Sequence, residues 1–99
     1  MKINRSSRYK KHLFQILDYI AKDKFSASEN FKNELDELID NLPNFPHKFR
    51  KSKYFNDENI RDMIYKGYTI IYKINLDKNI IDIVSIFNKN KPPLNLKNI

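Results

Sequence analysis

The segment IRDMIYKGYTIIY, residues 60–72, decides the fold of this 99-residue chain. At its centre, Lys66-Gly67 holds the only glycine of the sequence and separates two runs that are rich in β-branched and aromatic residues. A tight two-residue hairpin turn needs positive φ, which glycine adopts without steric cost. The segment therefore predicts a β-hairpin with strands at about Ile60–Tyr65 and Tyr68–Ile74.

A two-residue turn also determines which residues lie opposite each other in the two strands. The opposed residues on one face, together with Ile74, form the more apolar side, which should meet the helices: Tyr65 with Tyr68, Met63 with Ile70, and Arg61 with Tyr72. Side chains alternate along a strand, so the residues between them point the other way. We expect these to form a half-polar surface that is open to solvent: Asp62, Ile64, Thr69, Ile71 and Lys73.

A third strand is predicted at about Ile80–Phe87. It is apolar on both faces apart from Asp82 and Ser85, so we expect it in the interior of the sheet. Residues 91–99 contain two successive prolines, and we expect them to form an extended C-terminal tail.

Upstream of the hairpin, apolar residues recur every three or four positions, which is the spacing of one face of a helix. The first such helix begins near Ser7, and either Ser7 or Ser6 can cap it. Its apolar stripe consists of Tyr9, Leu13, Ile16, Leu17 and Ile20.

A second helix is marked by Ser26 and Glu29, which have the S-x-x-E spacing of a capping box. Pro43 ends it, because proline cannot continue a helix. Two helices joined by a link of about four or five residues predict an antiparallel helical hairpin. The apolar stripe of the second helix consists of Ala27, Phe31, Leu35, Leu38 and Leu42.

Residues 1–5 alternate in polarity and are compatible with a short edge strand, whereas the polar and basic residues 47–59 predict an irregular loop. The expected order is therefore strand, helix, helix and a three-stranded antiparallel meander. This is an α+β fold in which an antiparallel helical hairpin packs on one face of the sheet. A chain of this length fits one compact domain, so we assign residues 1–99 to a single domain.

The chain carries a net charge of +7, and the charge is unevenly distributed. Residues 25–42 hold one lysine and five acidic residues, so the positive excess lies elsewhere. A codon bias towards Lys, Ile and Asn would raise the lysine count but would not segregate it. The uneven distribution of charge creates a positive electrostatic field, which attracts polyanions or an acidic protein partner. The sequence has no cysteine for a disulfide and no apolar run of about 20 residues that could cross a bilayer. We therefore expect a cytoplasmic protein.

The loop at residues 47–53 is the first candidate site. Its closely spaced cations suit phosphate binding, although the charges of a merely solvated loop would look the same. The aromatic residues Phe49, Tyr54 and Phe55 could stack on bases or tuck the loop against the core. The cations are Lys48, Arg50, Lys51 and Lys53.

Arg61 fits either a contact with a binding target or an ion pair with a nearby carboxylate. The carboxylates in question are Asp57, Glu58 and Asp82. His12 and His47 have no second histidine at metal-ligand spacing, so we expect no metal site and no cofactor. Nucleophile motifs such as G-x-S-x-G are also missing, which disfavours an ordinary hydrolase.

Several segments resemble, in the same order, the RelE/ParE superfamily of toxins from type II toxin–antitoxin systems. They are Asp18–Asp23 followed by Ala27, Phe31 and Leu35, then Leu42–Pro46 followed by Arg50, the hairpin with its pattern R-x-x-x-x-x-G-Y-x-I-x-Y, and Ile81–Asn88. The resemblance covers nearly the whole chain. It implies a growth-inhibiting toxin, of the kind tied to plasmid stabilisation, whose partner is an acidic antitoxin that folds on binding it.

The resemblance also implies two alternative targets. RelE-type toxins are ribosome-dependent mRNA endonucleases that use basic residues on the open sheet face and near the C-terminus, whereas ParE-type toxins poison DNA gyrase. This chain departs from the nuclease pattern, because Thr69 follows Gly67-Tyr68 and because Asp62 and Ile64 occupy outward positions. It therefore favours a ParE-like toxin that is not an enzyme, with a ribonuclease or a non-toxic nucleic-acid-binding module as alternatives.

The candidate residues differ between these hypotheses. A ribonuclease would use Arg50, Lys51, Lys53, Lys73 and Lys89 as its catalytic set. The residues expected to bind the target, gyrase or ribosome with mRNA, are Lys48, Arg50, Lys51, Lys53, Arg61 and Lys89. No part of the sequence calls for a membrane.

Overall fold

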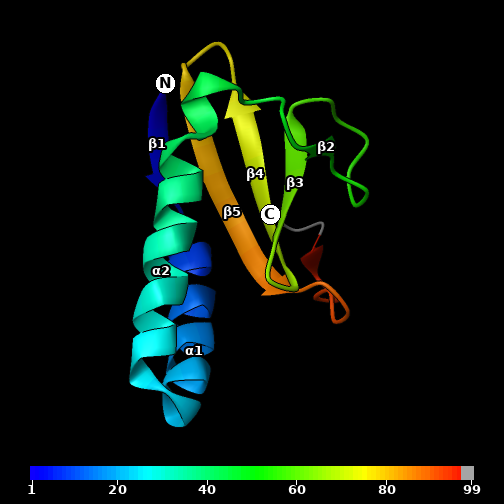
Figure 1. Ribbon diagram of the computed structural model, residues 1–99. Helices are drawn as coiled ribbons and strands as arrows, with labels where there is room; N and C mark the ends of the chain where they lie inside the picture. Colours follow the sequence, from blue (N-terminus) through cyan, green and yellow to red (C-terminus); the bar gives the residue numbers. More distant parts are fainter. Residues whose placement is uncertain (97–99) are drawn as a thin grey trace.

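A computed structural model describes residues 1–96 as two layers, a helical hairpin and a five-stranded sheet (Figure 1). The elements in chain order are β1 (Lys2–Arg5), α1 (Ser7–Asp23), α2 (Phe25–Asp40), the 3₁₀ helix η1 (Leu42–Asn44), β2 (Arg50–Lys51), β3 (Ile60–Tyr65), β4 (Tyr68–Asn75) and β5 (Ile80–Asn88). The strands lie in the order β1-β5-β4-β3-β2. This arrangement confirms the predicted α+β fold with its helical hairpin on one sheet face.

The β3–β4 hairpin has the register that the sequence predicts. Lys66 (φ 46°) and Gly67 (φ 85°) both have positive φ, as a two-residue type I′ turn requires. Tyr65 then pairs with Tyr68, and the ladder continues without a break. A Cβ atom added at position 67 would meet no atom within 4 Å, so the backbone conformation, and not lack of space, calls for glycine there.

Strand β5 lies in the sheet interior between β4 and β1, as its apolar sequence predicts. β1 pairs with it in parallel, and β4 pairs with it antiparallel. A bulge at Val84 shifts the register, because Ile71 pairs with Ser85 while Tyr72 pairs with Ile83. As a result Ile83 and Ile86 both pack towards the helices, although strict alternation would place residues three positions apart on opposite faces of the strand.

Helix α1 begins and packs as the sequence predicts. The Ser6 hydroxyl accepts a hydrogen bond from the Tyr9 backbone N–H at 3.1 Å and donates one to the Val84 carbonyl at 2.9 Å. One side chain therefore caps the helix and ties it to β5. Tyr9 and Leu13 are buried, and the other residues of the predicted stripe are half-buried.

Helix α2 differs from the prediction at its start. A single residue, Lys24, separates it from α1 instead of four or five. The expected capping box is wrong, because the helix already begins at Phe25 and no side chain caps it. The tight link suits the close approach of the helices, where the Ser28 hydroxyl donates to the Leu17 carbonyl at 2.8 Å. The buried residues of α2 are Ser28, Phe31, Leu35 and Ile39, whereas Ala27 and Leu38 are half-buried.

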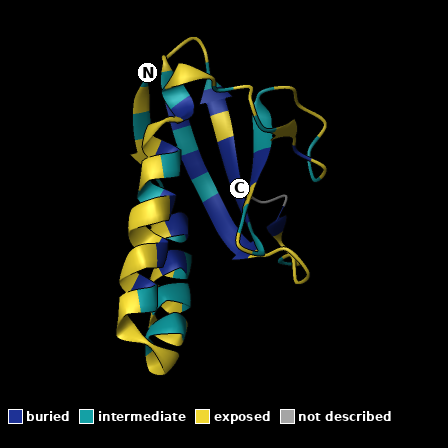
Figure 2. Ribbon diagram, viewed as in Figure 1, coloured by how far each residue is buried: buried dark blue, intermediate teal, exposed yellow. Residues whose placement is uncertain are grey.

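The sheet face that the sequence predicts to be open is instead largely covered (Figure 2). Asp62, Thr69 and Ile71 are 2%, 1% and 0% exposed, and only Ile64 and Lys73 of the expected set are exposed. The loop before β3 and the C-terminal tail lie over this face and form a second apolar cluster. Its members are Ile71, Phe87 and Leu96, with Tyr54, Phe55, Ile60 and Val84 packed against them.

The described part of the tail is held by contacts from both layers. Leu96 is 5% exposed in the second cluster, and Arg8 of α1 donates a hydrogen bond to the Asn95 side chain at 3.1 Å. The predicted extended tail ran to residue 99, and its last three positions lie outside the described residues. None of the helices in residues 1–96 is long and apolar enough to span a bilayer.

Tyr9 is fully buried in the main core, yet its hydroxyl has no hydrogen-bond partner within residues 1–96. An unsatisfied buried polar group is destabilising, so we expect Tyr9→Phe to raise the free energy of unfolding by about 1 kcal/mol. Urea denaturation at neutral pH measures this difference. A variant less stable than the wild-type protein would contradict the expectation.

Tyr9→Phe should also change how the free energy of unfolding falls at alkaline pH. Burial, reinforced by the nearby Asp36 carboxylate, raises the pKa of Tyr9 to about 12. The folded pKa lies above the unfolded value of about 10, so ionisation favours the unfolded chain, and stability that is present below pH 10 is lost as the pH rises towards 12. Tyr9→Phe should therefore lose less stability between pH 9 and about 11 than the wild-type protein does.

Candidate functional site

The basic cluster predicted at residues 47–53 lies at the edge of the sheet farthest from β1. The sequence predicts an irregular loop here, but part of this segment forms the short strand β2. β2 pairs antiparallel with β3, with Arg50 opposite Asp62 and Lys51 opposite Arg61. The pairing attaches the loop to the sheet edge, so its cations are displayed on a supported backbone.

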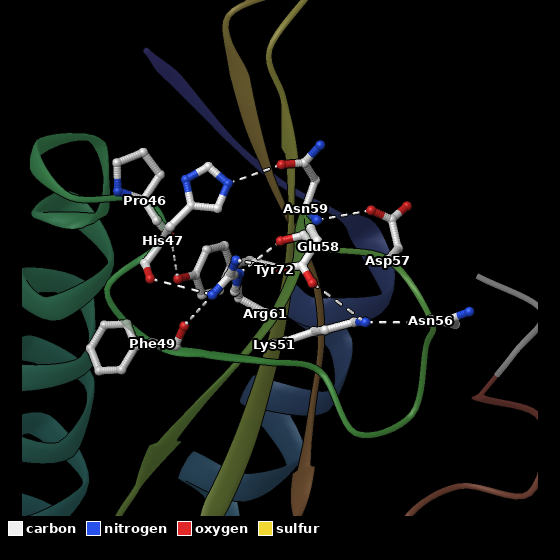
Figure 3. A network of polar contacts seen from close by, with 10 residues as sticks. All are labelled: Pro46, His47, Phe49, Lys51, Asn56, Asp57, Glu58, Asn59, Arg61 and Tyr72. Carbon is white, nitrogen blue, oxygen red and sulfur yellow. Dashed lines mark hydrogen bonds and ion pairs between the residues drawn. The ribbon is translucent and has the colours of Figure 1, made fainter.

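Arg61 of β3 holds this loop in place (Figure 3). Its guanidinium donates hydrogen bonds to the backbone carbonyls of Glu58 at 2.8 Å, Phe49 at 3.0 Å and His47 at 3.4 Å. It also pairs with the Glu58 carboxylate at 3.3 Å, and its side chain is only 13% exposed. Of the three carboxylates considered from the sequence, Glu58 is the one that binds it. Arg61 therefore sits behind the basic cluster and supports it.

Two further contacts close the loop at its ends. The Tyr72 hydroxyl donates a hydrogen bond to the Pro46 carbonyl at 2.6 Å, and burial raises the pKa of Tyr72 to about 12, so the donor stays protonated at neutral pH. His47 Nε2 lies 2.9 Å from Asn59 Oδ1. The role of Tyr72 as an anchor is not predicted from the sequence. Its predicted place opposite Arg61 on the apolar face was the one signal available.

Asp62 holds the loop from the other face of the sheet. Its side chain is 0% exposed, and its Oδ2 accepts a hydrogen bond from the Lys53 backbone N–H at 3.2 Å. The same oxygen lies 3.5 Å from the Arg50 guanidinium, whose side chain is half exposed. Its Oδ1 has no hydrogen-bond partner within the described residues. The buried carboxylate of Asp62 therefore balances part of the charge of Arg50.

The four cations of the cluster differ in how far their charge is balanced. Lys51 pairs with the Glu58 carboxylate at 3.5 Å. Lys48 and Lys53 make no ion pair within residues 1–96, and their ammonium groups lie 5.4 and 5.2 Å from the rings of neighbouring aromatic residues. Both side chains are exposed, so these two lysines present the least compensated charge of the cluster.

The aromatic residues of the loop are not free to stack on bases. Phe49 packs against the main core, whereas Tyr54 and Phe55 pack against the second apolar cluster. The Tyr54 ring meets the Phe87 ring edge to face, with centroids 5.6 Å apart. Their role is to press the loop onto both sides of the sheet edge, which was the structural alternative considered from the sequence.

Lys73 and Lys89 lie far from each other along the sheet. Lys73 of β4 pairs across from Asp82, whereas the Lys89 backbone N–H donates to the Gly67 carbonyl at the opposite end of that strand. Six positions of a strand separate these two levels, which corresponds to about 20 Å. The five cations considered for a ribonuclease therefore do not converge on one point.

The described residues contain no group of three or more His, Cys, Asp or Glu side chains that could hold a metal ion. The candidate site is thus a basic edge, supported by Arg61, Tyr72 and Asp62, with the chemistry of a binding surface for an anionic or acidic partner.

Comparison with known proteins agrees with this fold. No curated protein sequence matches the chain. Among the solved structures that match is the isolated Escherichia coli RelE toxin, with a TM-score of 0.59 and 13% identity, covering 98% of this chain and 93% of that one. At this identity the likeness concerns the fold alone. The sequence model of the ParE toxin of type II toxin–antitoxin systems matches residues 3–92. This chain therefore belongs to the ParE toxin family, as the toxin member of a type II toxin–antitoxin pair.

Proposed function

We propose that the chain inhibits growth by binding DNA gyrase in the cytoplasm, and that it does not cleave mRNA. The observation that carries the proposal is the covered second face of the sheet. The face on which a RelE-type nuclease would receive RNA is filled here by Tyr54, Phe87 and Leu96. Beneath them lie buried residues that offer no cation to a phosphate, such as Thr69 and Ile71.

The electrostatics of this face support the same conclusion. Cleavage of RNA without a metal requires positive groups around a pentavalent phosphate and help with proton transfer. Among the residues that β3, β4 and β5 direct to the second face, Lys73 is the one positive side chain, and it stands at the end away from the tail. Asp62 on the same face is buried and offsets part of the charge of the neighbouring Arg50. Binding without chemistry needs no such convergence.

In this proposal the basic edge makes the contact with the target. Lys48, Arg50, Lys51 and Lys53 are exposed on a backbone that is paired to the sheet, so binding an acidic or anionic surface requires little further ordering of the backbone. Arg61 acts through the loop that it holds and not by touching the target. Lys89, which lies at the far end of β4, is not part of this edge.

Induced expression with two readouts tests the target. We expect purified toxin to inhibit supercoiling by gyrase and to stabilise cleaved DNA on the enzyme, and we expect induced cells to show DNA damage. Primer extension on several transcripts should show no new cleavage sites at early times. Rapid cleavage of ribosome-bound messages, with supercoiling unaffected, would establish the RelE-type alternative instead. Salt-sensitive binding to nucleic acid without any toxicity would support the plain binding module.

A further inference from the structure

The loop that leads into the basic edge carries an exposed aromatic side chain. Phe45 is 72% exposed, whereas Phe49, four positions later, packs against the main core. Two hollows of about 260 and 520 Å³ border Phe45, and Lys48 lines both of them. Among the described residues, no carboxylate lines either hollow. The ring therefore stands at the surface beside one of the two least compensated cations of the basic edge.

The backbone that presents Phe45 is held on both sides. Pro43 and Pro46 flank it, and each proline restricts its own φ to about −65°. The Phe45 carbonyl accepts a hydrogen bond from the Lys48 N–H at 3.0 Å, and the Tyr72 hydroxyl binds the Pro46 carbonyl (Figure 3). Binding through this ring therefore requires little further ordering of the backbone, and exposed aromatic residues in such positions are typical anchors of protein interfaces.

Phe45 lies between charges of opposite sign. The cations of the basic edge follow it in the chain, whereas the last turns of α2 precede it. On α2, Glu37 is exposed and makes no ion pair within residues 1–96, and it stands one helical turn before Asn41, which lines the smaller hollow. The other carboxylates near this end of α2 are held in ion pairs, Glu34 with Lys66, and Asp36 and Asp40 with Arg5.

This distribution of charge selects the kind of partner. A polyanion lying across Phe45 would meet cations on one side and the free carboxylate of Glu37 on the other. A duplex fits poorly for the same reason, because an aromatic wedge between base pairs brings phosphates close on both sides. A folded protein can instead offer an apolar hollow for the ring and place its own carboxylates only where they face Lys48.

We propose that Phe45 is the apolar anchor of the contact with the target, and that it inserts into a hollow on a protein surface whose carboxylates face Lys48. The inference deepens the proposed function and rests on it, because it places the contact on the protein of gyrase and not on the DNA. The basic edge alone would not distinguish these two ligands, since its cations attract both.

Two phenylalanines of nearly equal exposure test the proposal. Phe45 and Phe25 are 72% and 69% exposed, but Phe25 begins α2, at the opposite end of the helical hairpin from η1 (Figure 1). Purified toxin would be titrated against intact gyrase without DNA. We expect Phe45→Ala to weaken binding at least about 30-fold and to relieve growth arrest, and Phe25→Ala to change the affinity less than about threefold.

A conservative variant and a second ligand sharpen the test. Phe45→Leu keeps an apolar side chain, so it should weaken binding less than Phe45→Ala does. The same proteins would be titrated against a short DNA duplex alone, where we expect both phenylalanine variants to bind as the wild-type toxin does. Circular dichroism and urea denaturation would establish that the variants fold, which the exposure of both rings favours.

Each contrary outcome has its own meaning. A folded Phe45→Ala protein that arrests growth and binds gyrase like the wild-type toxin removes Phe45 as the anchor. An equal loss of affinity for the duplex assigns the residue to DNA and overturns the choice of a protein partner. Lost affinity for the cognate antitoxin with full toxicity assigns Phe45 to the antitoxin instead. If wild-type toxin does not bind gyrase but Phe45→Ala still abolishes growth arrest, gyrase as the target fails while the anchor role of Phe45 is retained.

Discussion

Replacing Arg61 with alanine should lower the free energy of unfolding by about 3 kcal/mol, since hydrogen bonds from a charged donor contribute about 1.5–3 kcal/mol each and their loss leaves carbonyls without a partner. Three backbone carbonyls, of His47, Phe49 and Glu58, depend on this one guanidinium. We expect the loop between η1 and β3 to detach from the sheet edge, so that toxicity falls together with stability. Denaturation with urea and limited proteolysis of the loop measure the two effects.

The conservative variant Arg61→Lys is the matched control. A lysine ammonium retains the charge near Glu58 but cannot direct a planar fork of donors at several carbonyls at once. We therefore expect it to restore less than half of the lost stability. If Arg61→Ala lost less than about 1 kcal/mol and left the loop resistant to protease, the guanidinium would not be what holds the loop on the sheet edge.

Reversing the two least compensated charges of the basic edge should abolish growth arrest. The double variant Lys48→Glu with Lys53→Glu changes the charge of this edge by four units without breaking an ion pair, because neither lysine makes one within the described residues. We expect the fold to survive and target binding to fall by at least about 100-fold, through lost attraction and added repulsion. Growth after induction and supercoiling by gyrase in vitro measure the loss.

The control carries the same change of charge elsewhere. Lys2 of β1 and Lys78 of the β4–β5 turn are exposed and also make no ion pair in residues 1–96, so Lys2→Glu with Lys78→Glu alters the net charge equally. Full toxicity in this control, with loss of toxicity in the edge variant, would show that the effect depends on the charge of the basic edge and not on the net charge. Undiminished toxicity of a folded Lys48→Glu, Lys53→Glu protein would show that the basic edge does not bind the target. These lysines are more informative than Arg50, whose removal would unpair Asp62, and than Lys51, whose removal would leave Glu58 with Arg61 alone.

Local patterns account for the parts of the fold that the sequence predicts correctly. The lone Gly67 and the strands around it specify a turn with positive φ, and the turn then sets the register through Tyr65 and Tyr68. The stripe from Tyr9 to Ile20 specifies α1 in the same way. These signals depend on residues only a few positions apart, so they can be read without knowledge of the tertiary contacts.

The candidate site was predicted less completely, because its support comes from distant residues. The loop cations are visible in the sequence, but nothing local shows that Tyr72 reaches the Pro46 carbonyl or that Arg61 serves the loop and not a target. The failed capping box at Ser26 has a similar cause. The contact of Ser28 with the Leu17 carbonyl belongs to the packing of two helices, which overrides a local preference worth about 1 kcal/mol.

By itself, the sequence determined the two helices, the three C-terminal strands, the hairpin register and the positive charge of one loop, since dihedral preference and hydrophobic periodicity act over a few residues. Only the tertiary structure decided that the second face of the sheet is covered. That depends on Tyr54, Phe87 and Leu96 meeting on Ile71, and the apolar surface they bury together is a sum over segments that no local pattern relates. That burial supports the proposal that the protein does not cleave mRNA.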